Sequence, residues 1–150
     1  MITVNVSRKD AAKHPGLIWN AFVDVLALRK YAELSAEQRP AHLVFWYENE
    51  VQNGGHMQYF ENRGVERLED TFQALGLLGA VRQQQILREA GALFLSRPRE
   101  KIQTVKEFTE KALEDEFAEF DNQFYDCSPS LQECLERHLT EHQSNFVTIV

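Results

Sequence analysis

The sequence predicts an all-α fold, a single compact domain of six or seven helices that covers residues 1–150. Apolar residues recur at spacings of three and four along almost the whole chain, which is the period of a helix with one buried face. A chain of 150 residues, 43% of them hydrophobic, can bury about two-thirds of its unfolded surface in one core without a metal or a disulfide. No internal repeat, linker or low-complexity tract divides the chain.

Helix-start signals place the first two helices. Proline is tolerated in an opening turn, so the first helix begins at His14-Pro15. Residues 35–38 resemble a capping box, and Pro40 suits an early position in the helix that follows. The apolar stripes comprise Leu17, Ile18, Ala21, Phe22, Val25 and Leu28 in the first helix, and Leu43, Val44, Tyr47 and Val51 in the second.

A short helix with Met57 and Phe60 follows the second helix and ends at Gly64. Two further helices come next, with Gly76 and Gly79 near their junction. Their stripes comprise Val65, Leu68, Phe72 and Leu75, and then Ile86, Leu87, Ala90, Leu93 and Phe94. Residues 96–99 break the pattern and predict an exposed loop.

The last third of the chain predicts two helices, a long one from about Thr104 through Phe124 and a final one that begins near Ser128-Pro129. The long helix buries Val105, Phe108, Ala112, Leu113, Phe117, Phe120 and Phe124, and the final one carries Leu131, Leu135 and Leu139. Since each stripe needs a facing stripe, we expect one shared core. It should include Trp19, Phe22, Tyr47, Phe60, Phe72, Leu87, Phe108 and Phe117.

The two ends of the chain differ from the rest. Residues 2–6 and 146–150 have strand-like composition, so either the termini pair as a small β-ribbon or the tail packs on the helical bundle. The start lacks a signal segment, and no apolar run approaches the roughly 18 residues that cross a bilayer. The two cysteines, Cys127 and Cys134, fit a reducing compartment. We therefore expect a soluble, cytoplasmic protein.

The net charge of −7 is unevenly distributed. Residues 1–100 hold 12 basic and 12 acidic side chains, whereas residues 101–150 hold 4 and 11, so the whole excess lies in the last third. A protein that binds nucleic acid directly would need the opposite sign. The charge therefore favours a basic protein partner.

The densest motif spans residues 47–64, YENEVQNGGHMQYFENRG, which joins two aromatic-rich helical segments. Glycine adopts positive φ without a Cβ clash, so Asn53, Gly54 and Gly55 should end one helix and turn sharply into the next. We call the polar residues around this turn the hinge cluster. It comprises Glu50, Asn53, Gly54, Gly55, His56, Gln58, Tyr59 and Asn62, with Glu48 and Asn49 nearby.

Three motifs carry a resemblance to a known family. The pattern E-V-x-N-G-G-x-x-Q-Y-F-x-N-x-G from Glu50 to Gly64 is followed by A-L-G-x-x-G-A at 74–80 and I-L-x-x-A at 86–90. Together they resemble the bacterial DNA-mimic protein family, whose shared domain is otherwise of unknown function, over about residues 40–125. The resemblance implies an all-helical, acidic, dimeric protein, with at least one member that occupies the DNA-binding surface of a transcriptional regulator.

Carboxylates repeat along the predicted long helix. At 100° per residue Glu107, Glu114 and Asp121 fall on one line, away from the apolar stripe. At about 5 to 10 Å apart, such carboxylates can imitate backbone phosphates toward a partner's Lys and Arg. The alternative is an ordinary solvated face. The expected partner-binding residues are Glu107, Glu110, Glu114, Asp115, Glu119 and Asp121.

The hinge cluster has two interpretations. Glu50 points toward the apolar side of its helix, so a buried Glu50 needs a partner, which His56, Gln58, Tyr59 or Asn53 can supply. As an enzyme, the chain would use Glu50 as a base of raised pKa beside His56. A structural polar network is favoured, because no nucleophile, phosphate loop or paired acid accompanies these residues.

Cys134, His138 and His142 repeat every four residues on one predicted helix. The outer two lie about 12 Å apart along the axis, too far for all three to bind one zinc ion. We therefore expect packed or hydrogen-bonded core histidines and no metal or cofactor.

The sequence thus predicts a non-catalytic acidic interaction protein, a DNA mimic that binds a DNA-binding protein such as a transcriptional regulator. Two alternatives stay open: an immunity-type inhibitor of a nuclease toxin, and a small enzyme or ligand binder that uses Glu50, His56 and Tyr59. We also expect a homodimer, because Phe45 and Leu77 fall off the core faces and can form an apolar patch.

Overall fold

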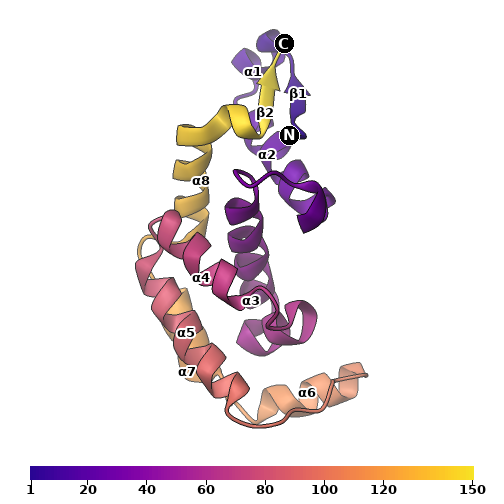
Figure 1. Ribbon diagram of the computed structural model, residues 1–150, viewed down its shortest axis with the longest axis vertical. Helices are drawn as coiled ribbons and strands as arrows, with labels where there is room; N and C mark the ends of the chain where they lie inside the picture. Colours follow the sequence, from indigo (N-terminus) through magenta and orange to yellow (C-terminus); the bar gives the residue numbers. More distant parts are fainter.

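The computed structural model describes the backbone of residues 1–150 and every side chain except that of Leu113. Over these residues the chain forms eight α-helices, two short 3-10 helices and two strands. The helices surround one core, the two chain ends lie together at one end of the molecule, and α6 extends from the opposite end (Figure 1). The elements are β1 (Val4–Val6), α1 (Arg8–Lys13), α2 (Gly16–Leu28), η1 (Tyr31–Glu33), α3 (Arg39–Arg63), α4 (Leu68–Leu77), α5 (Val81–Leu95), α6 (Val105–Leu113), α7 (Ala118–Tyr125), α8 (Leu131–His142), η2 (Gln143–Asn145) and β2 (Val147–Ile149).

The all-α prediction is confirmed, and so is the terminal ribbon. Strands β1 and β2 pair in parallel, with Val4 opposite Val147 and Val6 opposite Ile149. Helix α1 was not predicted from the sequence. Its six residues include none that is buried, so it has no apolar stripe, and it begins with a Ser7 side-chain cap.

The core contains most of the residues predicted for it. Of the described side chains, Phe22, Tyr47 and Phe60 are among the largest that are fully buried. Phe72, Leu87 and Phe117 are also buried. Trp19 and Phe108 are only partly buried, so the prediction overestimated the burial of these two side chains. The predicted burial of Leu113 concerns a side chain that the structure does not describe.

The predicted long helix from Thr104 through Phe124 was wrong. It divides into α6 and α7, separated by a turn in which Asp115 has a φ of 52°. Helix α7 turns back to pack against α3 and α5, and Phe124 on it is buried. Helix α6 instead has little packing against other elements, and its Val105 is 84% exposed. Tertiary packing of α7 therefore overrides the continuous helical period.

Along the described residues, none of the helices combines the length and the apolar character that crossing a membrane requires.

Candidate functional site

The Asn-Gly-Gly turn kinks α3 as the motif predicts. Gly54 has φ −154° and ψ 21°, and Gly55 has φ 74° and ψ −175°, so the helical conformation is interrupted at both. Only Gly55 lies in the region of positive φ that favours glycine. The positive φ expected of this turn therefore belongs to Gly55 and not to Gly54.

A polar network begins at the residue after the kink. The His56 backbone N–H and its ring Nδ1 both donate to Oδ1 of Asp121 on α7, at 2.8 and 2.7 Å. Since a carboxylate only accepts, Nδ1 carries the proton, and in the neutral ring Nε2 accepts the Tyr47 hydroxyl at 2.7 Å. Burial raises the pKa of Tyr47 well above its ordinary value, so the phenol stays a donor.

A second network surrounds Glu50, which is 6% exposed. Gln58 Nε2 and Asn62 Nδ2 donate to Glu50 Oε2 at 3.0 and 2.7 Å. Arg63 Nη2 lies 3.3 Å from Oε1. A buried carboxylate needs such partners, because leaving it unpaired costs several kcal/mol. The prediction that Glu50 points inward with a partner is confirmed, and the partners are Gln58, Asn62 and Arg63.

The hinge cluster is thus two networks. Asn53 Nδ2 joins the Glu50 network through Gln58 Oε1 at 3.0 Å, whereas His56 belongs to the Asp121 network. Tyr59 is 5% exposed and packs edge-on against Tyr47, with ring centroids 4.9 Å apart. Sequence reasoning missed Arg63 and the inward role of Asp121. Arg63 closes the helix one residue before Gly64, a position from which it can reach back to Glu50.

The part of the cluster around His56 and Asp121 has little room for a substrate. His56 is fully buried, and both ring nitrogens are engaged. A recess beside Gly54 and Asp121 has a volume of about 80 Å³, far below the roughly 300 Å³ of a typical small-molecule site. A carboxylate, an imidazole and a phenol aligned in this way hold one another and fix the kink against α7.

The acidic residues divide into two groups. Two of the seven carboxylates between Glu107 and Asp121 point toward the body: Asp121 bonds His56, and Glu116 bonds Arg99 at 2.6 Å and Arg97 at 3.0 Å. The Arg99 hydrogen bonds hold the pKa of Glu116 at about 2. The other five are exposed, and we call residues 105–119 that carry them the acidic arm. They are Glu107, Glu110, Glu114, Asp115 and Glu119.

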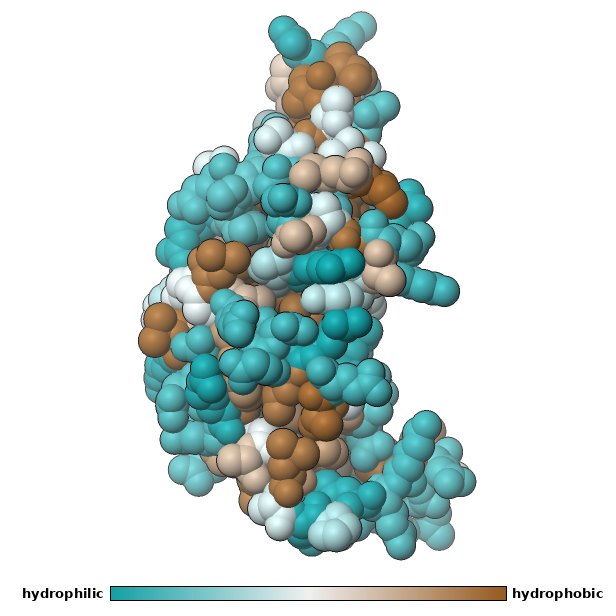
Figure 2. Space-filling view, viewed as in Figure 1, coloured by the Kyte–Doolittle hydropathy of each residue, from teal (hydrophilic) through white to brown (hydrophobic). Residues whose placement is uncertain are grey.

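The single line of Glu107, Glu114 and Asp121 was therefore a wrong prediction. The break at Asp115 changes the direction of the chain, and the Asp121 side chain is 23% exposed and bonded to His56. Two lysines lie beside the arm's acids, Lys106 at 4.0 Å from Glu110 and Lys111 at 3.8 Å from Glu114. Exposed pairs at such distances contribute little. Figure 2 shows the arm as a largely hydrophilic projection.

The third candidate group, Cys134, His138 and His142, does not form a common site. Cys134 and His138 are buried, whereas His142 is exposed at the end of α8. Burial lowers the pKa of His138 to about 4, and the neighbouring His142 adds to the effect. Among the described side chains, no three His, Cys, Asp or Glu residues come together as a metal site.

Comparison with known proteins places the chain in a family. A family model described as DMP19-like protein matches residues 32–142, about three-quarters of the chain. The chain therefore belongs to the DMP19-like protein family. No curated protein and no solved structure shows a significant match to it. The resemblance to a bacterial DNA-mimic protein family is corrected by this match, because the DMP19-like family is a distinct named family.

Proposed function

We propose that this DMP19-like protein is a non-catalytic interaction protein, a DNA mimic whose acidic arm binds the basic surface of a DNA-binding protein. The observation that carries the proposal is the set of five exposed carboxylates, four of which, Glu107, Glu110, Glu114 and Asp115, lie on or just after α6, the helix that projects from the body (Figure 1). Residues 105–119 hold six carboxylates, Glu116 included, and two lysines, which leaves a local charge of −4. A transcriptional regulator that binds DNA carries the matching positive surface.

The charge spacing is compatible with this role. Glu107, Glu110 and Glu114 give one carboxylate per three or four residues, or about 5 Å of helix axis. One DNA strand carries one phosphate per roughly 3.4 Å. The arm therefore offers the sign and the approximate repeat of a phosphate row at a lower density. Attraction of this kind speeds association and selects the basic surface.

Two other functions have weaker support. An immunity-type inhibitor of a nuclease toxin would use the same arm, and the identity of the captured protein distinguishes it. An enzyme or ligand binder centred on Glu50, His56 and Tyr59 is supported less, because Glu50 and His56 are buried and bonded to neighbouring side chains. Self-association through an apolar patch is also part of the proposal. Leu77 and Val81 are 68% and 66% exposed, whereas Phe45 packs partly against the core.

The test is capture of partners from a cell lysate on the immobilised protein. We expect a DNA-binding protein to be retained at low salt, to be released as salt rises, and to be displaced by double-stranded DNA. Exposed charge attraction is screened over about 8 Å at physiological ionic strength. The variant E110K/E114K should lose this capture. Glu107 is left unchanged because it accepts the Gln103 backbone N–H and supports the start of α6.

A matched control is E89K/E136K, which makes the same change in net charge at two exposed glutamates on α5 and α8. This control should retain the partner. Equal loss in both variants would indicate a general charge effect, and normal capture by E110K/E114K with little salt dependence would reject the arm as the binding surface.

A further inference from the structure

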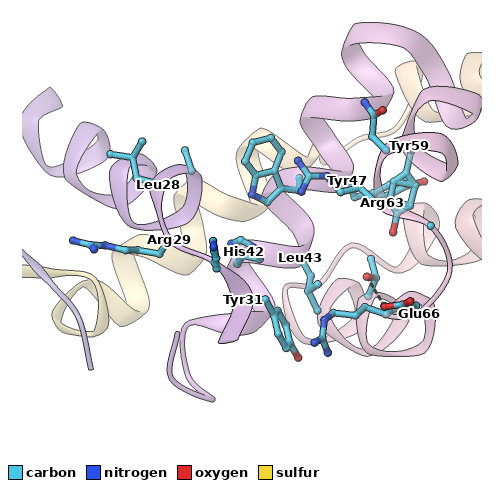
Figure 3. A pocket seen from close by; sticks show the side chains of 16 residues that line it. Leu28, Arg29, Tyr31, His42, Leu43, Tyr47, Tyr59, Arg63 and Glu66 are labelled. Carbon is cyan, nitrogen blue, oxygen red and sulfur yellow. Dashed lines mark hydrogen bonds between the residues drawn. The ribbon is translucent and has the colours of Figure 1, made fainter. Parts of the chain in front are cut away.

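A second feature of the molecule is a cavity remote in sequence from the acidic arm. It has a volume of about 450 Å³ and lies between the end of α2, η1, both parts of α3 and the start of α4 (Figure 3). Its volume falls within the roughly 300 to 1,000 Å³ of small-molecule sites, and no residue of the arm lines it.

The walls of the cavity are aromatic and apolar. Tyr31, Trp46 and Tyr59 line it together with Leu28 and Leu43. The Trp46 indole N–H donates to the Leu26 carbonyl at 3.2 Å, and His42 Nδ1 lies 3.0 Å from the same oxygen. Both rings are therefore held in place before any ligand arrives, which reduces the entropy lost on binding.

The cavity is lined mainly by positive charges, although the protein as a whole is negatively charged. Four cations line it, Arg29, Lys30, Arg63 and Arg67, against one lining carboxylate, Glu66. The protein as a whole carries −7. Burial lowers the pKa of His42, and the nearby Arg63 and Arg67 lower it further, as expected for a positive local field.

Two arginines are held on aromatic faces. The Arg63 guanidinium lies 3.8 Å from the Trp46 ring centroid, and that of Arg67 lies 3.6 Å from the Tyr31 centroid. Stacking engages the face of a guanidinium and leaves its N–H edge available to a carboxylate or phosphate. Glu50 Oε1 lies 3.3 Å from Arg63 Nη2 and engages one of the Arg63 nitrogens, whereas the Arg67 contact with Asp70, at 3.8 Å and half exposed, is weak.

We propose that this cavity binds a small organic anion, a planar apolar group that carries a carboxylate or a phosphate. Arg63 and Arg67 bond the anionic group, and Trp46, Tyr59 and Leu43 contact the planar part. The site is concave and fits one small molecule better than a flat macromolecular surface. This inference stands independently of the proposed function, since it uses none of the acidic carboxylates.

The experiment measures binding of defined probes by calorimetry and by tryptophan fluorescence. Phenyl phosphate and indole-3-acetate represent the phosphate and carboxylate sources, inorganic phosphate lacks the planar group, and indole-3-ethanol lacks the charge. We expect saturable binding of at least one aryl anion at millimolar concentration or below, and at least tenfold weaker binding of inorganic phosphate and of the neutral alcohol. Comparison of the two aryl anions identifies the favoured anionic group.

Two variants and one control locate the site. R67Q removes a half-exposed charge, and L28E adds a carboxylate at a rim position that is 74% exposed, so neither should prevent folding. Each should weaken aryl-anion binding about tenfold or more. R88Q is the matched control, because Arg88 also stacks on a ring, that of Phe72 at 4.5 Å, outside the cavity.

Three results would overturn the proposal. The first is the lack of saturable binding by either aryl anion, and the second is equal binding by wild type and R67Q. The third is binding of an acidic peptide, dependent on Arg67, where both aryl anions fail, which would assign the cavity to a protein segment.

Discussion

Replacing Gly55 by alanine tests whether the kink and the His56 network form one unit. A Cβ at Gly55 would lie 2.4 Å from Oδ2 and 2.9 Å from Cγ of Asp121, so the carboxylate must move. The backbone at φ 74° and ψ −175° adds strain of about 1 to 3 kcal/mol for any other residue. Displacing a carboxylate from its donors costs about 1.5 to 3 kcal/mol more. We expect a total loss of about 2.5 to 6 kcal/mol.

The assay is equilibrium unfolding in urea, together with a measurement of thermal unfolding. For a chain of this length the expected loss corresponds to a fall in Tm of about 10 °C. Gly54→Ala is the neighbouring comparison. Its Cβ would lie 2.1 Å from Oε1 and 2.9 Å from Cβ of Gln58, so Gln58 must move, but the φ of Gly54 is negative and no positive-φ strain is added, so the loss should be smaller. Gly16→Ala has open space around it and should be nearly neutral.

A double-mutant cycle with Asp121→Asn separates strain from the displaced carboxylate. If Gly55→Ala acts partly through Asp121, its cost should be smaller in the Asp121→Asn background, by more than about 0.5 kcal/mol. A loss below about 1 kcal/mol for Gly55→Ala, or equal losses for Gly54→Ala and Gly55→Ala, would refute the assignment of the kink to Gly55.

Two further predictions concern stability against pH and self-association. The pKa of His138 is about 4 in the folded protein and an ordinary 6.5 in the unfolded chain, so the unfolded chain takes up the proton first as the pH falls. The stability that the neutral His138 contributes should therefore be fully present above pH 6.5. The free energy of unfolding should fall by up to about 3 kcal/mol as the pH drops to 4. Urea unfolding should show a smaller fall in H138Q and an unchanged one in H14Q, whose position is exposed. Leu77→Glu should shift any dimer toward monomer in sedimentation, and a wild-type monomer at high micromolar concentration would contradict the proposed dimer.

Local signals were sufficient for most of the helices because each has its own apolar stripe and end signals. The Gly54-Gly55 kink and the helix end at Gly64 followed from glycine chemistry, and the inward direction of Glu50 followed from the helical period. The division of the predicted long helix did not. Asp115 has only a weak preference for positive φ, so the break is decided by contacts of α7 with α3 and α5.

The cavity could not be predicted from the sequence either, because its lining residues come from separate elements of the fold. Its cations come from the end of α2 and the two sides of Gly64, and no spacing along the chain relates Arg29 to Arg67. Such a set becomes visible only when the elements are packed. A stacked arginine gives no local pattern, because both partners look like ordinary surface residues in the sequence.

The seven carboxylates between Glu107 and Asp121 show how one charge run can serve two purposes. Glu116 and Asp121 lie on either side of the start of α7, and they fix this helix to Arg97, Arg99 and His56. The same helix therefore anchors the base of the acidic arm while the five remaining carboxylates stay exposed. A charge-reversal experiment that includes Glu116 or Asp121 would disturb folding and partner binding together. Only changes restricted to the exposed group test whether the arm binds a basic partner.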